Sequence, residues 1–116
     1  MNARRYHRIK TEAEWRKALD VSHREPVAIY KHSSLCELCL MASDKLSALQ
    51  SDTDPPIYEV VVQEARPLSN LIEKELKIRH ESPQVIVLHK GDAVFNASHW
   101  DVTASAVRDA VARTAL

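Results

Sequence analysis

Short apolar runs alternate along this chain with segments in which apolar residues recur every three or four positions. Buried strands produce the first pattern, and amphipathic helices produce the second. The predicted strands cover residues 27–30, 57–62, 84–88 and 93–96, and the predicted helices cover residues 12–21, 36–50, 67–76 and a segment after Thr103. The order αβαβαββα predicts an α/β fold in which a central mixed four-stranded sheet is flanked by helices on both faces.

Cap and turn residues mark the ends of these elements. Thr11 and Glu14 have the spacing of a capping box ahead of the first helix, and Pro67 suits a first helical turn. Gly91 is the only glycine and marks a turn, so we expect the last two strands to form a hairpin. Thr103 is expected to cap the final helix. Because no linker, repeat or low-complexity tract divides the chain, we expect a single domain over residues 1–116.

The balance of charge argues against several classes of partner. Sixteen Lys and Arg residues match 16 Asp and Glu residues, which gives a formal net charge of zero. Such a chain has no overall electrostatic attraction to nucleic acid or acidic lipid, so we expect neither as a partner. The basic N-terminus lacks the apolar stretch of a signal peptide, and no apolar run approaches the roughly 20 residues of a membrane span. These features predict a cytoplasmic protein.

Cys36 and Cys39 form a C-x-x-C motif where a predicted strand leads into a predicted helix. In a cytoplasmic α/β chain this position is typical of a redox motif. The unpaired amides and the dipole of a helix N-terminus stabilise a thiolate, so Cys36 is the expected nucleophile. Cys39 should be more buried and is placed to attack a mixed disulfide formed at Cys36. Glu37 opposes activation because its carboxylate repels the thiolate.

Two other interpretations of the cysteines stay open at this point. They could be small apolar residues buried at the start of a core helix. They could also be half of a zinc site that His23 or His32 would join, but the spacing offers only two close ligands, so we predict no metal. A separate feature, Ser82-Pro83, precedes the third strand, and a cis bond there would shape a backbone edge for substrate; the residues alone favour the commoner trans form.

Four blocks of residues give the chain a family resemblance that covers nearly its whole length. They read Lys31-His32-Ser33-Ser34 before Cys36, Arg66-Pro67-Leu68-Ser69-Asn70, Arg79-His80-Glu81-Ser82-Pro83-Gln84, and Ala97-Ser98-His99-Trp100-Asp101. With these blocks the chain resembles the thioredoxin superfamily and, more closely, the YtxJ-like monothiol bacilliredoxins. The last two blocks are the more specific ones.

The resemblance implies a thioredoxin-like fold, a cis Pro83 and a bacterial, cytoplasmic enzyme. Such an enzyme would remove bacillithiol, a low-molecular-weight thiol, from protein mixed disulfides. Its partners would be bacillithiolated proteins and bacillithiol itself, which acts as a thiol co-substrate, and no bound cofactor is expected. The chain departs from the family pattern, which has Pro after the first Cys and typically Ser at the position of Cys39. We therefore expect Cys36 to be catalytic and Cys39 to resolve its adduct.

Seven further residues are candidates for substrate binding. They are His32, Ser33, His80, Ser82, Pro83, His99 and Trp100. The three histidines could bind the acidic groups of bacillithiol or tune Cys36, although structural histidines are commoner. We expect Trp100 to pack in the core rather than to serve as a ligand platform. The alternatives to debacillithiolation are a general dithiol thioredoxin-like disulfide reductase and a non-catalytic module that binds a thiol or a partner.

Overall fold

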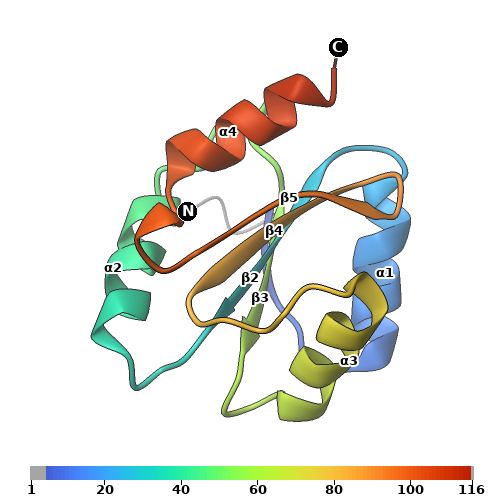
Figure 1. Ribbon diagram of the computed structural model, residues 1–116. Helices are drawn as coiled ribbons and strands as arrows, with labels where there is room; N and C mark the ends of the chain where they lie inside the picture. Colours follow the sequence, from blue (N-terminus) through green and yellow to red (C-terminus); the bar gives the residue numbers. More distant parts are fainter. Residues whose placement is uncertain (1–4, 116) are drawn as a thin grey trace.

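A computed structural model describes residues 5–115 and shows a mixed sheet of five strands in the order β1-β3-β2-β4-β5 (Figure 1). The strands are β1 (Tyr6–Arg8), β2 (Val27–His32), β3 (Ile57–Val61), β4 (Gln84–His89) and β5 (Asp92–Ser98). β3 pairs in parallel with both β1 and β2, whereas β4 pairs antiparallel with β2 and β5. The thioredoxin-like arrangement expected from the sequence is confirmed by these pairings.

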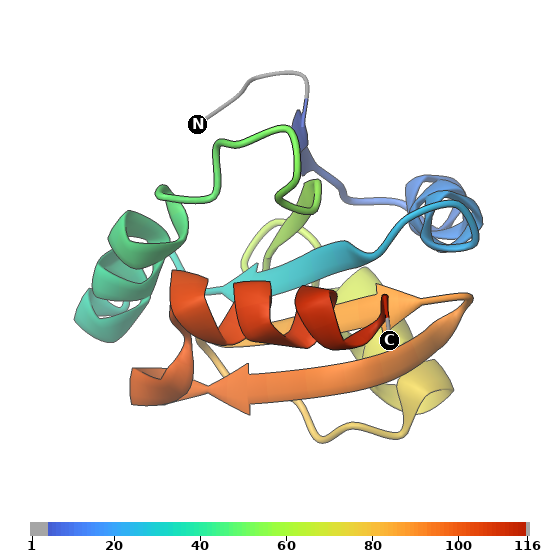
Figure 2. The same cartoon turned by 90° about the horizontal axis from the view of Figure 1, so that it is seen from above.

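In the described part of the chain, four α-helices cover the two faces of the sheet. They are α1 (Glu12–Ser22), α2 (Glu37–Leu46), α3 (Arg66–Leu76) and α4 (Ala104–Arg113), with a short 3₁₀ helix, η2 (His99–Asp101), packed against α2. Figures 1 and 2 show α1 and α3 on one face, and α2 and α4 on the other. Within residues 5–115, no helix is long and apolar enough to span a membrane.

Each face of the sheet has its own hydrophobic core. Val27 and Ile29 of β2 point towards α1 and α3, where they join a cluster that includes Trp15 and Ile72. The alternate residues of β2 point the other way, into a cluster with α2 and α4 that includes Leu46. β2 is therefore buried on both sides, which explains why its sequence is a continuous apolar run rather than an alternating one.

The structure corrects three of the predicted features of the sheet and of α2. The sheet has five strands rather than four, because residues 6–8 pair with β3 although they contain no apolar run. Helix α2 ends at Leu46 rather than near Gln50. Met41, which the helical spacing assigned to the buried face of α2, is exposed. The predicted single domain extends to residues 1–4 and 116, which lie outside the described residues.

The capping box at the start of α1 is confirmed and provides a test of local stability. The Thr11 hydroxyl accepts a hydrogen bond from the Glu14 amide at 3.2 Å, and the Glu14 carboxylate accepts one from the Thr11 amide at 3.1 Å. We predict that Thr11→Ala lowers the free energy of unfolding by about 1 kcal/mol, measured by denaturant titration, because one helical amide loses its acceptor. Thr11→Ser keeps the hydroxyl and should retain most of that stability; equal losses in both variants would contradict the prediction.

Candidate functional site

The two cysteines lie at the start of α2, shortly after the central strand β2 ends. Cys36 occupies the N-cap position of α2 with an extended backbone, and residues 33–35 connect it to the end of β2. Cys39 lies one turn further in and is only 1% exposed, whereas Cys36 is partly exposed; both are free thiols. The helix therefore presents its unpaired amides to one thiol and buries the other.

The environments of the two thiols push their pKa values apart. The Cys39 amide, then the Cys39 thiol and the Leu38 amide, lower the pKa of Cys36, while the carboxylate of Glu37 opposes the shift. Burial raises the pKa of Cys39, and this effect exceeds the opposing hydrogen bonds from Ser82 and Ser33. The expected order of ionisation, Cys36 before Cys39, therefore follows from helix amides on one side and desolvation on the other.

The segment before β4 reaches the buried cysteine. The Ser82–Pro83 peptide bond is cis, as the family resemblance implied. The Ser82 hydroxyl lies 3.3 Å from Cys39 Sγ, and the Ser33 amide donates to the same sulfur at 3.3 Å. The carbonyl of buried Pro83 accepts a hydrogen bond from the His99 amide at 2.9 Å. Ser33 and Ser82 thus contact the sulfur of Cys39, and Pro83 follows Ser82 in the chain.

His32 joins the site through a buried carboxylate that the sequence analysis missed. Its Nε2 atom lies 2.7 Å from Oε2 of Glu59, and its ring stacks on that of Tyr30 at a centroid distance of 4.7 Å. The Tyr30 hydroxyl donates to the Cys39 carbonyl at 2.9 Å. The available sequence signal was a lone acidic residue in the otherwise apolar run 57–62. Such a residue needs buried partners, and His32 is one of them.

Burial alone would raise the pKa of Glu59, but hydrogen bonds from His32, Tyr6 and Arg8 outweigh it and hold the pKa at about 2. The Arg8 Nε atom donates to Oε1 at 2.7 Å, and the Tyr6 hydroxyl donates to Oε2. The carboxylate is therefore ionised at neutral pH and fully engaged by three donors.

A pocket of about 280 Å³ opens beside Cys36. Its lining consists of residues 32–37 together with Leu40 and Ser43. Around it the surface is apolar, because Leu35 is 87% exposed and Leu40 is 73% exposed. Of the predicted substrate-binding residues, His32 and Ser33 line this pocket.

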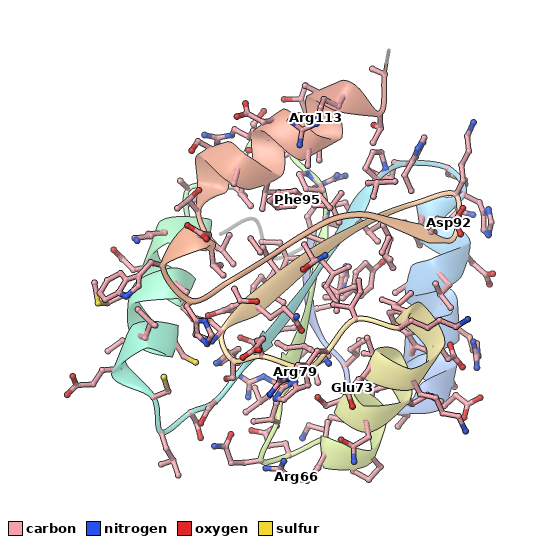
Figure 3. All side chains as sticks on the ribbon, viewed as in Figure 1. Arg66, Glu73, Arg79, Asp92, Phe95 and Arg113 are labelled. Carbon is pink, nitrogen blue, oxygen red and sulfur yellow. The ribbon has the colours of Figure 1, made fainter. Side chains whose placement is uncertain are left out.

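Three other predicted residues lie away from the pocket. His80 sits against α3, where its amide donates to the Glu73 carboxylate at 2.6 Å; Figure 3 labels Glu73 and, in the segment leading to β4, Arg79. His99 is exposed and its Nε2 atom lies 3.4 Å from the Glu81 carboxylate. Trp100 is 63% exposed, with Lys45 Nζ 5.7 Å from its ring centroid, so the expected core packing is wrong.

The zinc alternative finds no support in the geometry. Over residues 5–115 no three His, Cys, Asp or Glu side chains come together as a metal site. His32 is held by Glu59, and His23 follows the C-terminal end of α1, where it lies against Gly91.

Comparisons with known proteins agree with this geometry. The family model for Monothiol bacilliredoxin BrxC matches residues 7–107. A solved protein described as a putative oxidoreductase with a thioredoxin fold is 26% identical, with a TM-score of 0.82 over 91% of this chain and 93% of that chain. Schistosoma mansoni thioredoxin is 13% identical, with a TM-score of 0.75 over 97% of this chain and 98% of its own. Oxidised thioredoxin O2 from Arabidopsis thaliana is 22% identical, with a TM-score of 0.72 over 94% and 93%. At these identities the two thioredoxins establish the fold alone.

The difference between the two thiols is testable by alkylation. We predict that Cys39→Ser, which keeps Cys36, reacts with iodoacetamide at pH 7 at least about ten times faster than Cys36→Ser, which keeps only the buried thiol. The midpoint of the Cys36 rate against pH should fall below the ordinary value of about 8.5 for a free cysteine. Mass spectrometry of the alkylated protein gives both rates. A Cys36 that reacts no faster than a free cysteine would contradict the site assignment.

Glu59 should make the protein sensitive to acid. Its pKa is about 2, against an ordinary value of 4.5, so its stabilising contribution is complete above 4.5 and disappears as the pH falls towards 2. The shift corresponds to about 3 kcal/mol. We predict that Glu59→Gln removes this part of the pH dependence of unfolding, measured by denaturant titration between pH 2 and pH 6. The control Glu64→Gln, which alters a more exposed partner of Arg8, should keep the wild-type slope. Identical slopes in Glu59→Gln and wild type would show that Glu59 is not so perturbed.

Proposed function

The chain belongs to the monothiol bacilliredoxin family of thioredoxin-fold proteins, and from this premise we propose that it removes bacillithiol from protein mixed disulfides through Cys36. The observation that carries the proposal is the asymmetry of the cysteine pair. Cys36 borders a pocket and has a lowered pKa, whereas Cys39 is buried and has a raised one. Only the first thiol is equipped to open a reaction with an external disulfide. The proposed setting is a bacterial cytoplasm.

In the proposed reaction the Cys36 thiolate attacks the bacillithiol sulfur of the mixed disulfide. A bond forms between Cys36 Sγ and that sulfur while the original disulfide bond breaks. The electron pair of the broken bond goes to the sulfur of the target protein, which takes up a proton and leaves as a thiol. The target is thereby reduced, and Cys36 becomes bacillithiolated.

The surface around Cys36 supports a substrate with both a protein part and a small-thiol part. Leu35 and Leu40 expose apolar area on either side of the motif, which suits contact with a protein surface. His32 and Ser33 in the pocket are the proposed contacts for the polar groups of bacillithiol. The backbone beside Ser82 and Pro83 is the proposed edge for an extended substrate segment. His80, His99 and Trp100 remain weaker candidates because they lie outside the pocket.

Cys39 is proposed to resolve the bacillithiolated intermediate. It lies one helical turn from Cys36, close enough for the two thiols to influence each other's ionisation. Its thiol would lose a proton and attack Cys36 Sγ, and the bond from Cys36 to bacillithiol would break. Bacillithiol would leave as a thiol, and a Cys36–Cys39 disulfide would remain for a dithiol reductant to reopen. A general dithiol disulfide reductase is the second candidate function, and the presence of Cys39 is what favours it.

One mass-spectrometric experiment tests these steps. Reduced protein is mixed with a bacillithiolated protein substrate, and the reaction is quenched after one turnover. The mass of the intact protein is then measured. We predict an internal disulfide in the wild type, a stable bacillithiol adduct in Cys39→Ser, and no reaction in Cys36→Ser. A stable adduct in both the wild type and Cys39→Ser would reject resolution by Cys39.

The same assay with a glutathione-linked substrate tests thiol specificity. We expect the bacillithiol-linked substrate to react faster with the wild type. Equal rates would contradict debacillithiolation as the specific function and would favour the general disulfide reductase.

A further inference from the structure

We propose that His32 carries the proton of the exchange reaction and that the buried Glu59 carboxylate positions it. The inference rests on the proposed thiol-disulfide exchange at Cys36, and it adds the residue that takes the proton from one sulfur and delivers it to another. The substrate class is any disulfide whose departing sulfur is basic enough to need a proton, such as that of an ordinary protein cysteine.

The first step of the argument is the charge on Glu59. This residue is 4% exposed in a strand whose neighbours Tyr58 and Val60 are buried and largely apolar. A buried cluster of charged side chains is weak evidence for stability, because well-packed apolar residues often replace such a cluster without lowering the free energy of unfolding. The carboxylate is nevertheless engaged by Arg8, Tyr6 and His32. Two of these donors come from the edge strand β1, and the third comes from the end of β2, beside the cysteines.

The second step concerns which nitrogen of His32 holds hydrogen. An ionised carboxylate can only accept hydrogen bonds, so the Nε2 atom, 2.7 Å from Glu59, must be the donor. In the neutral ring this leaves a lone pair on Nδ1, and in the cation it leaves a second hydrogen there. Stacking on Tyr30 fixes the plane of the ring. Glu59 therefore leaves Nδ1 as the nitrogen that can exchange a proton.

The third step is the location of the ring. His32 lines the same pocket as Cys36, and 13% of its side chain is exposed. Besides the nucleophile itself, Glu37 is the other titratable residue among those that line the pocket. Of these two types of side chain, imidazole is the one whose ordinary pKa lies between pH 5 and 8. Within this pocket, His32 is consequently the side chain suited to accept and return a proton near pH 7.

The proposed step consumes and releases no net proton. Nδ1 of His32 accepts the proton of the Cys36 thiol, which yields the thiolate and an imidazolium paired with Glu59. The thiolate attacks one sulfur of the disulfide, the new sulfur–sulfur bond forms and the old one breaks. The departing sulfur takes the electron pair and then the proton from Nδ1. No external acid, base or oxidant is consumed, and His32 ends in its starting form.

The leaving group provides the test, because a basic alkyl thiolate needs protonation whereas an aromatic thiolate leaves as a stable anion. Single-turnover exchange at pH 7 is measured in the Cys39→Ser background with bis(2-hydroxyethyl) disulfide and with 5,5′-dithiobis(2-nitrobenzoate). We expect His32→Gln to slow the alkyl reaction at least about tenfold and the aromatic reaction less than twofold. Glutamine keeps a hydrogen-bond donor for Glu59 but cannot carry a proton. Equal slowing with both disulfides would overturn the proposal.

Two further variants separate positioning from general damage to the fold. Glu59→Gln should show the same selective loss with the alkyl disulfide if the carboxylate acts through His32. His89→Gln, at the opposite end of β4 from the site, should leave both rates unchanged. Circular dichroism confirms folding of each variant, and the result for His32→Gln decides the proposal if Glu59→Gln does not fold.

A measurement on the protein with His32 intact needs no folding control. In D₂O the alkyl reaction should slow more than the aromatic one, since only the former moves a proton to the leaving sulfur; equal slowing would count against His32. The assay uses no bacillithiol, so its failure is distinct from failure of the proposed function. Exchange with neither disulfide would refute redox activity at Cys36, whereas exchange with both and no leaving-group selectivity would refute only the role of His32.

Discussion

The chemistry of this protein depends on the burial of β2 on both faces of the sheet. Its neighbours β3 and β4 fix its backbone by parallel and antiparallel pairing, and two separate cores hold its side chains. The C-terminal end of the strand is therefore held in one position, and the cysteine motif begins four residues after it. β3 brings Glu59 opposite Tyr30, and β4 brings Gln84, next to Pro83, opposite Lys31. Residues distant in sequence thus meet through strand register rather than through flexible loops.

Successive side chains at the end of β2 lie on opposite faces of the sheet, in two different environments. Tyr30 points to the cysteine side, where its hydroxyl bonds the backbone of Cys39. The side chain of Lys31 points towards α3, and burial lowers its pKa to about 8, while the Glu73 carboxylate works in the opposite direction. Successive residues on a strand face opposite sides of the sheet, so the ammonium group of Lys31 is kept away from the thiols. The lowered pKa of Cys36 therefore comes from helix amides and the Cys39 thiol and not from a lysine partner.

Much of the fold could be predicted because its signals are local. The capping box at Thr11, the apolar run of β2 and the turn at Gly91 each depend on a few neighbouring residues, and so does the placement of the cysteines at a helix start. The misses depend on contacts distant in the sequence. β1 has only three residues and exists through its pairing with β3, about fifty positions away. The bond between His32 and Glu59 spans 27 positions, and only strand register reveals it. Trp100 is exposed because η2 turns its side chain outwards beside Lys45, which apolar composition alone cannot show.

The burial of one thiol determines which cysteine reacts first in the proposed reaction. Two thiols with equal pKa values would compete for an incoming disulfide, but here desolvation raises the pKa of Cys39 while the amides of α2 lower that of Cys36. In the proposed reaction Cys39 acts after Cys36, because its sulfur is buried and a large substrate meets the partly exposed Cys36 first. Glu37 reduces the difference between the two thiols, since its carboxylate raises the pKa of Cys36, which the amides lower. A less acidic Cys36 is a stronger nucleophile once ionised, although a smaller fraction of it is ionised, so a residue able to take its proton near pH 7 becomes useful. A histidine held by a buried carboxylate in the same pocket fits that need.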